Sequence, residues 1–305
     1  MLKSGKRLRS LTMLIILLMM TGACSRTQFF YTQLDWIIPR YVDHYISLND
    51  EQYNILDVHT QQFLKWHCST HLHKYAGWFT RLSHDVNKGY MDTGKIELYM
   101  DELEVFWEEL VDEYVPGLAV AIYQADDKQV MELFENISEK NAELSEELVE
   151  PPLKEVEQEL TERMQDRFEN WFGSLTTAQL ESIRLWSKKI APHQRLRLVM
   201  RERWKNKLQQ LFVYRQQLPE FVTGVRQLIK NPQQVWTPEY KQQFAQTRQG
   251  VINLIEQSVN SLTVKQRQYF IKQASSWGRD LNALSCDKRK MKISGSRGQV
   301  LHSAS

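Results

Sequence analysis

The chain has 305 residues, of which 39 are Lys or Arg and 37 are Asp or Glu, so its formal net charge is only +2. Glycine and proline, with 12 and 8 copies, are scarce, and residues of high helix propensity are abundant. No stretch alternates apolar and polar residues as a strand would, and after the N-terminal segment no apolar run reaches membrane length. The composition therefore predicts an all-α chain of one large or two small domains and excludes a protein with several membrane spans.

The first 23 residues have the layout of a secretory signal peptide. Basic residues are concentrated between positions 3 and 9, and an uncharged run follows from Leu11 to Met20. As a helix this run would span about 15 Å, roughly half of a bilayer core, which is too short for an ordinary transmembrane helix. Residues 1–23 are therefore predicted to be removed on export.

The sequence Thr21-Gly22-Ala23-Cys24 resembles the bacterial lipobox, although the lipobox usually has leucine at the place of Thr21. The resemblance implies that the Cys24 thiol carries a diacylglyceryl lipid and that further acyl chains such as palmitate complete the anchor. Ser25 stands where aspartate retains such proteins at the inner membrane, which implies the periplasmic face of the outer membrane. The alternative is a plain secretory signal followed by an incidental cysteine.

Charge is divided unevenly along the mature chain. Residues 24–172 contain 12 Lys or Arg and 30 Asp or Glu, a net of −18, whereas residues 173–305 contain 23 and 7, a net of +16. The predicted helical lipoprotein domain, residues 24–285, thus has an acidic half (24–172) and a basic half (173–285). The basic tail that follows (286–305) is predicted to be disordered. The halves could pack together, remain separately solvated, or leave the basic half to face anionic lipid headgroups.

Apolar residues recur every three to four positions through most of the mature chain, which is the pattern of amphipathic helices. We expect an elongated bundle of eight to ten helices and no sheet, with helices near residues 26–46, 50–86, 96–114, 126–149, 153–171, 177–190, 192–218, 220–229, 238–259 and 264–284. Pro39 and Pro116 are expected to kink or interrupt the helices that contain them. The side chains predicted to be buried include Leu103, Trp107, Leu160, Phe168 and Trp171.

Four of these helices begin with a similar motif. A cap residue is followed three positions later by glutamine, in the pairs Asn49 and Gln52, Asp126 and Gln129, Thr176 and Gln179, and Thr263 and Gln266. This spacing predicts capping boxes, in which each of the two side chains binds the other residue's backbone N–H group. The motif also resembles the LTxxQ motif of small periplasmic helical chaperones, which implies a chaperone-like or stress-related role. The alternative is that any well-capped helix has this pattern.

Several motifs together resemble a family of bacterial lipoproteins known mainly as a domain of unknown function. They are Asp35-Trp36, Leu48-Asn49-Asp50-Glu51-Gln52, Trp66-His67, Tyr75, Lys140-Asn141-Ala142-Glu143, and the stretch from Arg163 through Arg167 to Trp171-Phe172-Gly173. The resemblance covers most of residues 24 to about 215. Family members often have arginine and proline where this chain has Cys68 and His73. The resemblance implies an envelope address and a helical fold, and no activity.

Two cysteines remain after lipidation of Cys24. Cys68 and Cys286 can form only one intramolecular disulfide, and an oxidising compartment permits it. The alternative is two free thiols.

A search for chemistry finds no phosphate loop, GxGxxG, HExxH or GxSxG motif. His67 and His71 lie four residues apart, so both can face one side of a helix and are the candidate metal ligands. Cys68 and His73 point elsewhere on the same helix. The alternatives are surface histidines, or a His67 that forms a hydrogen bond at a helix contact.

The favoured function is therefore that of a non-catalytic binding or chaperone-like lipoprotein of the periplasm, and not an enzyme. Its only cofactor is the covalent lipid on Cys24. Its expected partners are the membrane, through the lipid, and an unidentified protein, but not nucleic acid. The rival function is a metal- or redox-responsive protein that uses His67, Cys68 and His71. The sequence does not specify the oligomeric state.

Overall fold

The computed structural model describes residues 30–286, and the predicted signal peptide, the lipidation site Cys24 and the tail beyond Cys286 lie outside this range. The prediction of an all-α fold is confirmed, since residues 30–286 form eleven α-helices and two short 3-10 helices with no strand. The elements are α3 (Leu34–Asp43), α4 (Asp50–Thr70), α5 (Leu72–Asn87), α6 (Thr93–Ile122), α7 (Asp127–Leu148), α8 (Leu153–Phe172), α9 (Thr177–Ile190), η1 (Ala191–His193), α10 (Gln194–Val213), α11 (Leu218–Lys230), η2 (Pro232–Val235), α12 (Pro238–Asn260) and α13 (Val264–Leu284). None of these helices is long and apolar enough to cross a membrane.

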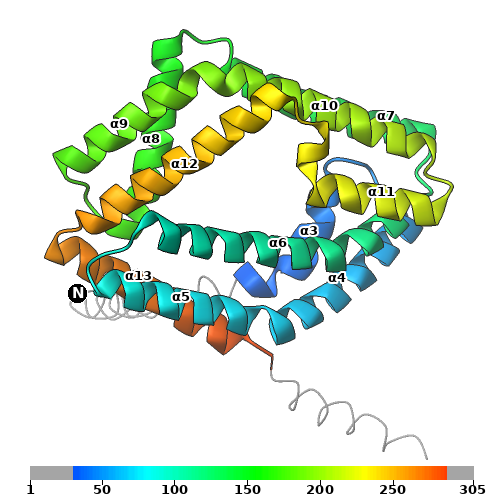
Figure 1. The fold of residues 1–305 in the computed structure, drawn as a ribbon. Coiled ribbons are helices and arrows are strands. Elements are labelled where there is room, and N and C mark those ends of the chain that lie inside the picture. The colour runs from blue at the N-terminus through cyan, green and yellow to red at the C-terminus, as the bar shows by residue number, and fades with distance from the viewer. Residues whose placement is uncertain (1–29, 287–305) are drawn as a thin grey trace, which may run out of the picture.

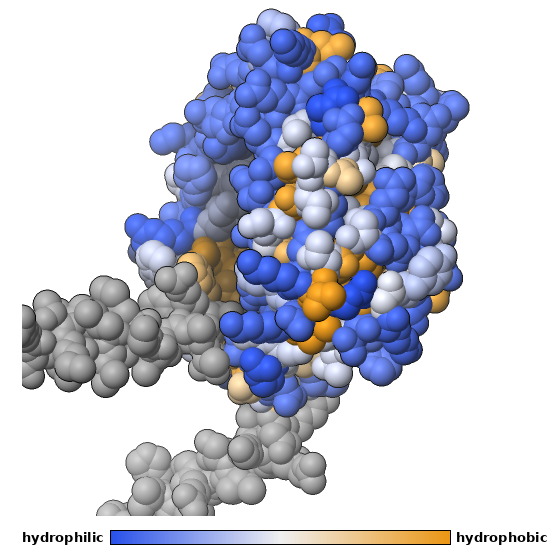
Figure 2. Space-filling model, turned by 90° about the vertical axis from the view of Figure 1, so that its left-hand side faces the viewer, coloured by the Kyte–Doolittle hydropathy of each residue, from blue (hydrophilic) through white to orange (hydrophobic). Residues whose placement is uncertain are grey.

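The helices are arranged as the sides of a closed frame (Figure 1). Helices α3, α4, α5, α6 and α13 form one side, α8 and α9 a second, and α7, α10 and α11 a third, while α12 connects them along α9 and α6. The surface turned toward the viewer in Figure 2 is mostly hydrophilic, with hydrophobic areas scattered among polar residues.

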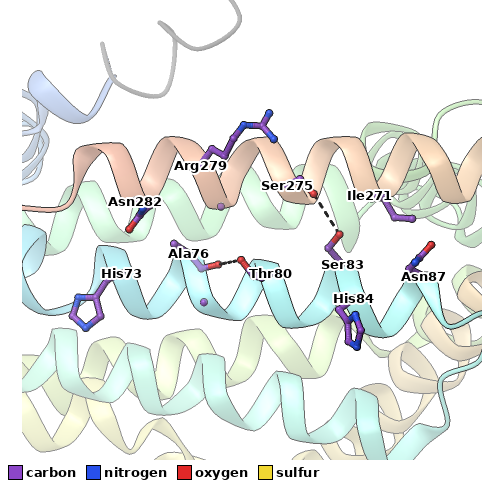
Figure 3. Close-up of a pocket in the computed structure, with 12 residues that line it drawn as sticks. His73, Ala76, Thr80, Ser83, His84, Asn87, Ile271, Ser275, Arg279 and Asn282 are labelled. Atoms are coloured by element: carbon purple, nitrogen blue, oxygen red, sulfur yellow. Dashed lines mark hydrogen bonds between the residues drawn. The ribbon is translucent and has the colours of Figure 1, made fainter.

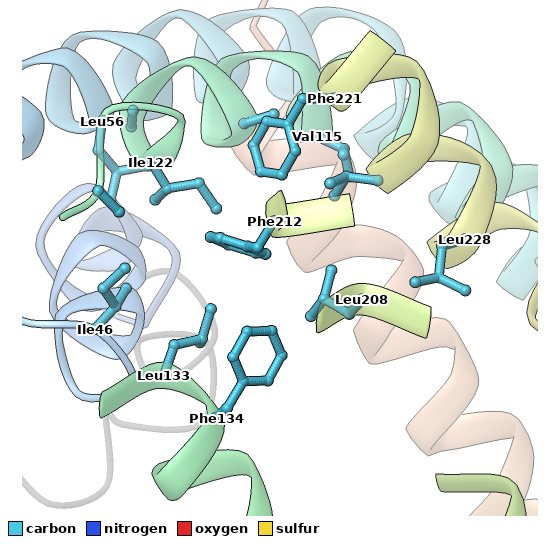
Figure 4. Packing of buried hydrophobic residues seen from close by; sticks show 14 of the residues in the cluster. Ile46, Leu56, Val115, Ile122, Leu133, Phe134, Leu208, Phe212, Phe221 and Leu228 are labelled. Atoms are coloured by element: carbon cyan, nitrogen blue, oxygen red, sulfur yellow. The ribbon is translucent and has the colours of Figure 1, made fainter. Parts of the chain in front are cut away.

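Two hydrophobic clusters hold the frame together. The first lies among α4, α6, α7, α10 and α11 and includes Leu56, Ala119, Phe212 and Phe221 (Figure 4). The second lies among α5, α8, α9, α12 and α13 and is formed around buried side chains such as Ile183. Both clusters contain residues from both sides of Gly173, so the acidic and basic halves share their cores.

Helix α6 contributes to both clusters, and this explains where the predicted burial fails. Phe168 is buried as predicted, whereas Leu160 and Trp171 are only partly buried. Leu103 and Trp107, however, are 46% and 54% exposed, so their predicted burial is wrong. They lie in the stretch of α6 between the two clusters, where their face of the helix is left uncovered. Periodicity identifies an apolar face but not whether another element covers it.

One predicted helix is divided, and one predicted interruption does not end its helix. The predicted helix 50–86 is divided at His71 into α4 and α5, and Pro116 lies inside α6, which continues to Ile122. The glycine after Pro116 has a packing role, because a Cβ atom at Gly117 would lie 2.1 Å from the ring of His59 on α4. His59 in turn forms a 2.9 Å hydrogen bond with the backbone oxygen of Tyr114.

All four predicted capping boxes are present, at the starts of α4, α7, α9 and α13. The structure adds that their glutamines form pairs. Gln129 donates to Gln52 at 2.7 Å, and Gln266 donates to Gln179 at 2.8 Å. Each motif therefore caps its own helix and also joins that helix start to another one. A buried amide needs such a partner, since an unpaired one costs about 1–3 kcal/mol.

Ion pairs between the acidic and basic halves involve three basic residues of the described chain. Arg248 of α12 contacts the acidic side of α6, with its closest approach to Asp101 at 2.6 Å. Lys230 binds Asp112 at 2.6 Å, and Arg215 binds Asp127 at 2.7 Å. Opposite charges thus meet where the halves pack. Each such partly exposed pair contributes about 0–1 kcal/mol.

Candidate functional site

The predicted histidine site lies where α4 meets α5. The His67 and His71 rings are nearly parallel, with 10° between their planes and 5.7 Å between their centroids. Tyr31 and Tyr75 contact His67 from two sides, with their hydroxyls 2.9 Å from Nδ1 and 3.4 Å from Nε2. Both ring nitrogens of His67 therefore have hydroxyl partners.

His71 is almost completely buried, at 1% exposure, and sits beside an ion pair. Its Nε2 lies 3.3 Å from the Glu109 carboxylate, which Lys74 binds at 2.7 Å. Burial, and then the positive charge of Lys74, lower the pKa of His71, while Glu109 opposes them. Lys74 is thus the cation that neutralises Glu109, and burial disfavours the protonated form of His71.

This geometry does not converge on a metal ion. The lone pair of an imidazole nitrogen lies in the plane of the ring, so two parallel stacked rings direct their lone pairs along parallel lines that do not meet. A zinc ion would need a nitrogen of each ring within about 2.1 Å of itself. The Cys68 sulfur is bonded to Cys286, and it is therefore not a free thiolate. Within residues 30–286 no group of three or more His, Cys, Asp or Glu side chains is placed to hold a metal. What the structure shows at this junction is an aromatic and hydrogen-bonded cluster.

His67 should make the folded chain sensitive to acid. Burial, and then the charge of His71, lower the pKa of His67 from 6.5 to about 4. The unfolded chain therefore binds this proton near pH 6.5 and the folded chain does so only near pH 4. Stability should be highest above pH 6.5 and should fall by at most about 3 kcal/mol as the pH drops to 4.

Urea unfolding of the wild type and a His67→Gln variant at pH 7 and pH 4.5 measures this effect. The variant should lose part of the pH dependence, because glutamine keeps polar contacts but does not titrate. His73→Gln is the matched control, since His73 is exposed on the next helix. An unchanged pH dependence in His67→Gln would contradict the assignment.

A disulfide joins the same region to the end of the described chain. Cys68 and Cys286 are bonded, with their Cα atoms 5.1 Å apart, and the Cys286 N–H donates to the Cys68 carbonyl at 3.0 Å. The bond ties the segment just after α13 to the end of α4. Helix α13 runs antiparallel to α5 from there.

A shallow groove of about 610 Å³ follows the seam between α5 and α13 (Figure 3). Half of its lining residues are glycine, alanine, serine or threonine, which allow close helix packing. A Cβ atom at Gly278 would lie 3.5 Å from the Ala76 carbonyl. Thr80 donates to that carbonyl at 2.8 Å, and Ser83 and Ser275 face each other at 3.5 Å. These groups bind one another, so the groove is a packing seam.

A mainly apolar cavity of about 420 Å³ lies against the first hydrophobic cluster and is open to solvent near Tyr41, which is 63% exposed. Its lining residues include Ile122, Leu133, Leu208 and Phe212, which Figure 4 shows among the packed side chains of the cluster. Helices α3, α6, α7, α10 and α11 all contribute to its walls. The lining residues are Tyr41, Val42, Tyr45, Ile46, Leu118, Ile122, Leu133, Ile137, Lys140, Asn141, Arg201, Trp204, Leu208, Phe212, Val225 and Ile229. Its volume is within the range of about 300–1,000 Å³ that is typical of small-molecule sites.

The polar side chains that line this cavity include an arginine, an asparagine and two tyrosines. Arg201 donates through Nε to the Asn141 side chain at 2.7 Å. The hydroxyl of Tyr41 lies 3.4 Å from that of Tyr45. This hydrogen bond, and then desolvation, raise the pKa of Tyr45 to about 12, so Tyr45 stays protonated at neutral pH. Asn141 belongs to a motif that carries the family resemblance, but no sequence pattern indicated that it would meet Arg201, because the two residues lie on separate helices.

The fold and site define an all-α, disulfide-linked helical frame with an apolar cavity. The model of DUF6279, a family of unknown function, matches residues 44–241. Since the match covers more than half of the chain, this protein belongs to that family. No curated protein and no solved structure matches the chain. The match confirms that the chain belongs to a family of unknown function, and the lipoprotein character and the LTxxQ resemblance remain predictions.

Proposed function

We propose that this protein is an envelope lipoprotein, anchored through Cys24 to the periplasmic face of the outer membrane, that binds an apolar ligand without transforming it. The observation that carries the binding role is the apolar cavity between α3, α6, α7, α10 and α11. Each methylene group that enters such a cavity from water contributes about 0.8 kcal/mol to binding. Among the described residues that line it, none is a histidine, cysteine, serine or carboxylate, which supports binding rather than catalysis.

Lipid attachment is tested first. Replacing Cys24 with alanine should abolish incorporation of a clickable palmitate analogue, because the acceptor thiol is removed. Ser25→Ala is the matched control and should retain full labelling. Labelling that persists in Cys24→Ala would overturn the anchor.

Binding in the cavity is tested on the full chain, reconstituted in nanodiscs of a neutral phospholipid. A photoactivatable long-chain fatty alcohol should crosslink to peptides of α7 and α10, as located by mass spectrometry. Ile137→Trp should reduce this crosslinking severalfold, because Ile137 lines the cavity and the larger side chain fills it.

Leu98→Trp is the control, since Leu98 is 64% exposed on α6 and far from the cavity lining. Circular dichroism and unfolding midpoints verify that both variants fold. Crosslinking that is equal in the two variants, or spread evenly over the helices, would refute ligand binding in the cavity.

A further inference from the structure

The polar side chains of the cavity gather at one end. Helices α7 and α10 pack antiparallel: Phe134 lies against Phe212 with their rings 5.5 Å apart, and Asn141 binds Arg201 further along. On α7 the apolar lining precedes Lys140 and Asn141. On α10 it follows Arg201. Both helices therefore bring their polar turns to the same end of the cavity and their apolar turns to the other.

On one face of α10, the apolar residues of the cavity wall are followed by basic residues that extend beyond the cavity. Arg197, Arg201, Trp204 and Leu208 are spaced by four, three and four residues, so they lie on one side of the helix. Trp204 and Leu208 form part of the apolar wall, and Arg201 lies at its polar end. Arg197 is one turn further out on the same face. Two arginines thus stand in line with an apolar slot.

In the described part of the chain, neither of these arginines forms a direct ion pair; Arg201 reaches the Glu202 carboxylate only through Asn141, which accepts from Arg201 and donates to Glu202. The neighbouring lysines are neutralised, Lys140 by Glu143 at 2.6 Å and Lys205 by Glu202 at 2.7 Å. Within residues 30–286, neither arginine of this face has a carboxylate within ion-pair distance.

Arg197 also experiences the charge of its neighbour. Although its side chain is exposed on α10, the surrounding helices partly desolvate the guanidinium, and this desolvation, followed by the charge of Arg201, lowers the pKa of Arg197. A bound anion between the two would relieve that repulsion and accept charge-assisted hydrogen bonds.

We infer that the ligand is an anionic amphiphile: one acyl chain lies against Trp204 and Leu208, and its carboxylate or phosphate head binds Arg201 and Arg197. The protonated Tyr45 hydroxyl adds a hydrogen-bond donor at the same end. This assignment rests on the proposed function, because it specifies the head group of a ligand whose chain occupies the cavity.

The test compares two photoactivatable probes of equal chain length, one a fatty acid and one a fatty alcohol, on the full chain in neutral nanodiscs. The wild type should bind the acid about tenfold more tightly than the alcohol, since charge-assisted hydrogen bonds are available only to the acid. The double variant Arg197→Gln/Arg201→Gln should bind both probes with the affinity of the alcohol. Arg195→Gln, on another face of α10, is the matched control and should behave as the wild type.

Competition with unlabelled lipids identifies the class of ligand that supplies the acyl chain. Displacement by unlabelled fatty acid alone supports a free carboxylate ligand, and displacement by lysophosphatidylglycerol supports a phosphate-headed lipid. Equal binding of acid and alcohol by the wild type, with both blocked by Ile137→Trp, would overturn the anionic head while the cavity function stands. Absence of any probe from α7 and α10 would overturn both.

Discussion

Replacing both Cys68 and Cys286 with serine should lower the free energy of unfolding by about 5 kcal/mol. The disulfide closes a loop between residues 218 positions apart, and in the chain-entropy model a loop of this length restricts the unfolded chain strongly. The loss would be a large part of a typical total stability of about 5–15 kcal/mol. Helix α13 should be affected most, because the bond fixes the residues that directly follow it to α4.

Denaturant unfolding with and without reductant measures this effect. Reductant should lower the unfolding midpoint of the wild type to that of the double variant and should leave the double variant unchanged. Free-thiol labelling of both cysteines in protein taken directly from cells, or equal midpoints for the wild type and the variant, would show that the bond contributes nothing.

The second large effect concerns two adjacent residues of α6. Phe106→Ala should cost about 3–5 kcal/mol, because the side chain is 7% exposed and packs edge-on against Tyr75 with ring centroids 5.0 Å apart. Trp107→Ala should cost less than about 1 kcal/mol, because Trp107 is 54% exposed. Removing the larger aromatic side chain should therefore matter less than removing the smaller one.

Urea unfolding of the two variants tests whether Trp107 is buried, as the helical periodicity predicts, or exposed, as in the tertiary structure. Each variant is the control for the other, since they lie in the same turn and lose an aromatic ring alike. A larger loss for Trp107→Ala than for Phe106→Ala would mean that the sequence-based prediction of a buried Trp107 was right.

The proposed lipid anchor would place the cavity close to its proposed ligands. A lipid-anchored protein remains at the membrane surface, where amphiphiles leave and enter the bilayer. The His67 cluster and the disulfide hold the junction of α4 and α5 and the end of α13, and α4 packs along α6, which forms one wall of the cavity. On this proposal, the histidines and cysteines support the frame, and the chemistry of recognition belongs to α10.

The sequence by itself determined the local features of the fold. The all-α class and the four capping boxes follow from residues within one or two turns of each other, so no long-range contact is needed to predict them. For Cys68 and Cys286 the sequence left two alternatives, a disulfide or two free thiols. Lipidation of Cys24 leaves each of them only one possible partner, but the sequence does not give the distance between them.

The tertiary structure decided what those local features contact. The exposure of Leu103 and Trp107 depends on the separation of two hydrophobic clusters along α6. The pairing of Gln179 with Gln266 joins helix starts 87 residues apart. The cavity brings together side chains from Tyr41 to Ile229, and its charged end depends on which residues reach Arg201. An amphipathic pattern records that a face is apolar, whereas covering that face, leaving it open or hollowing it into a cavity is fixed only when distant helices pack.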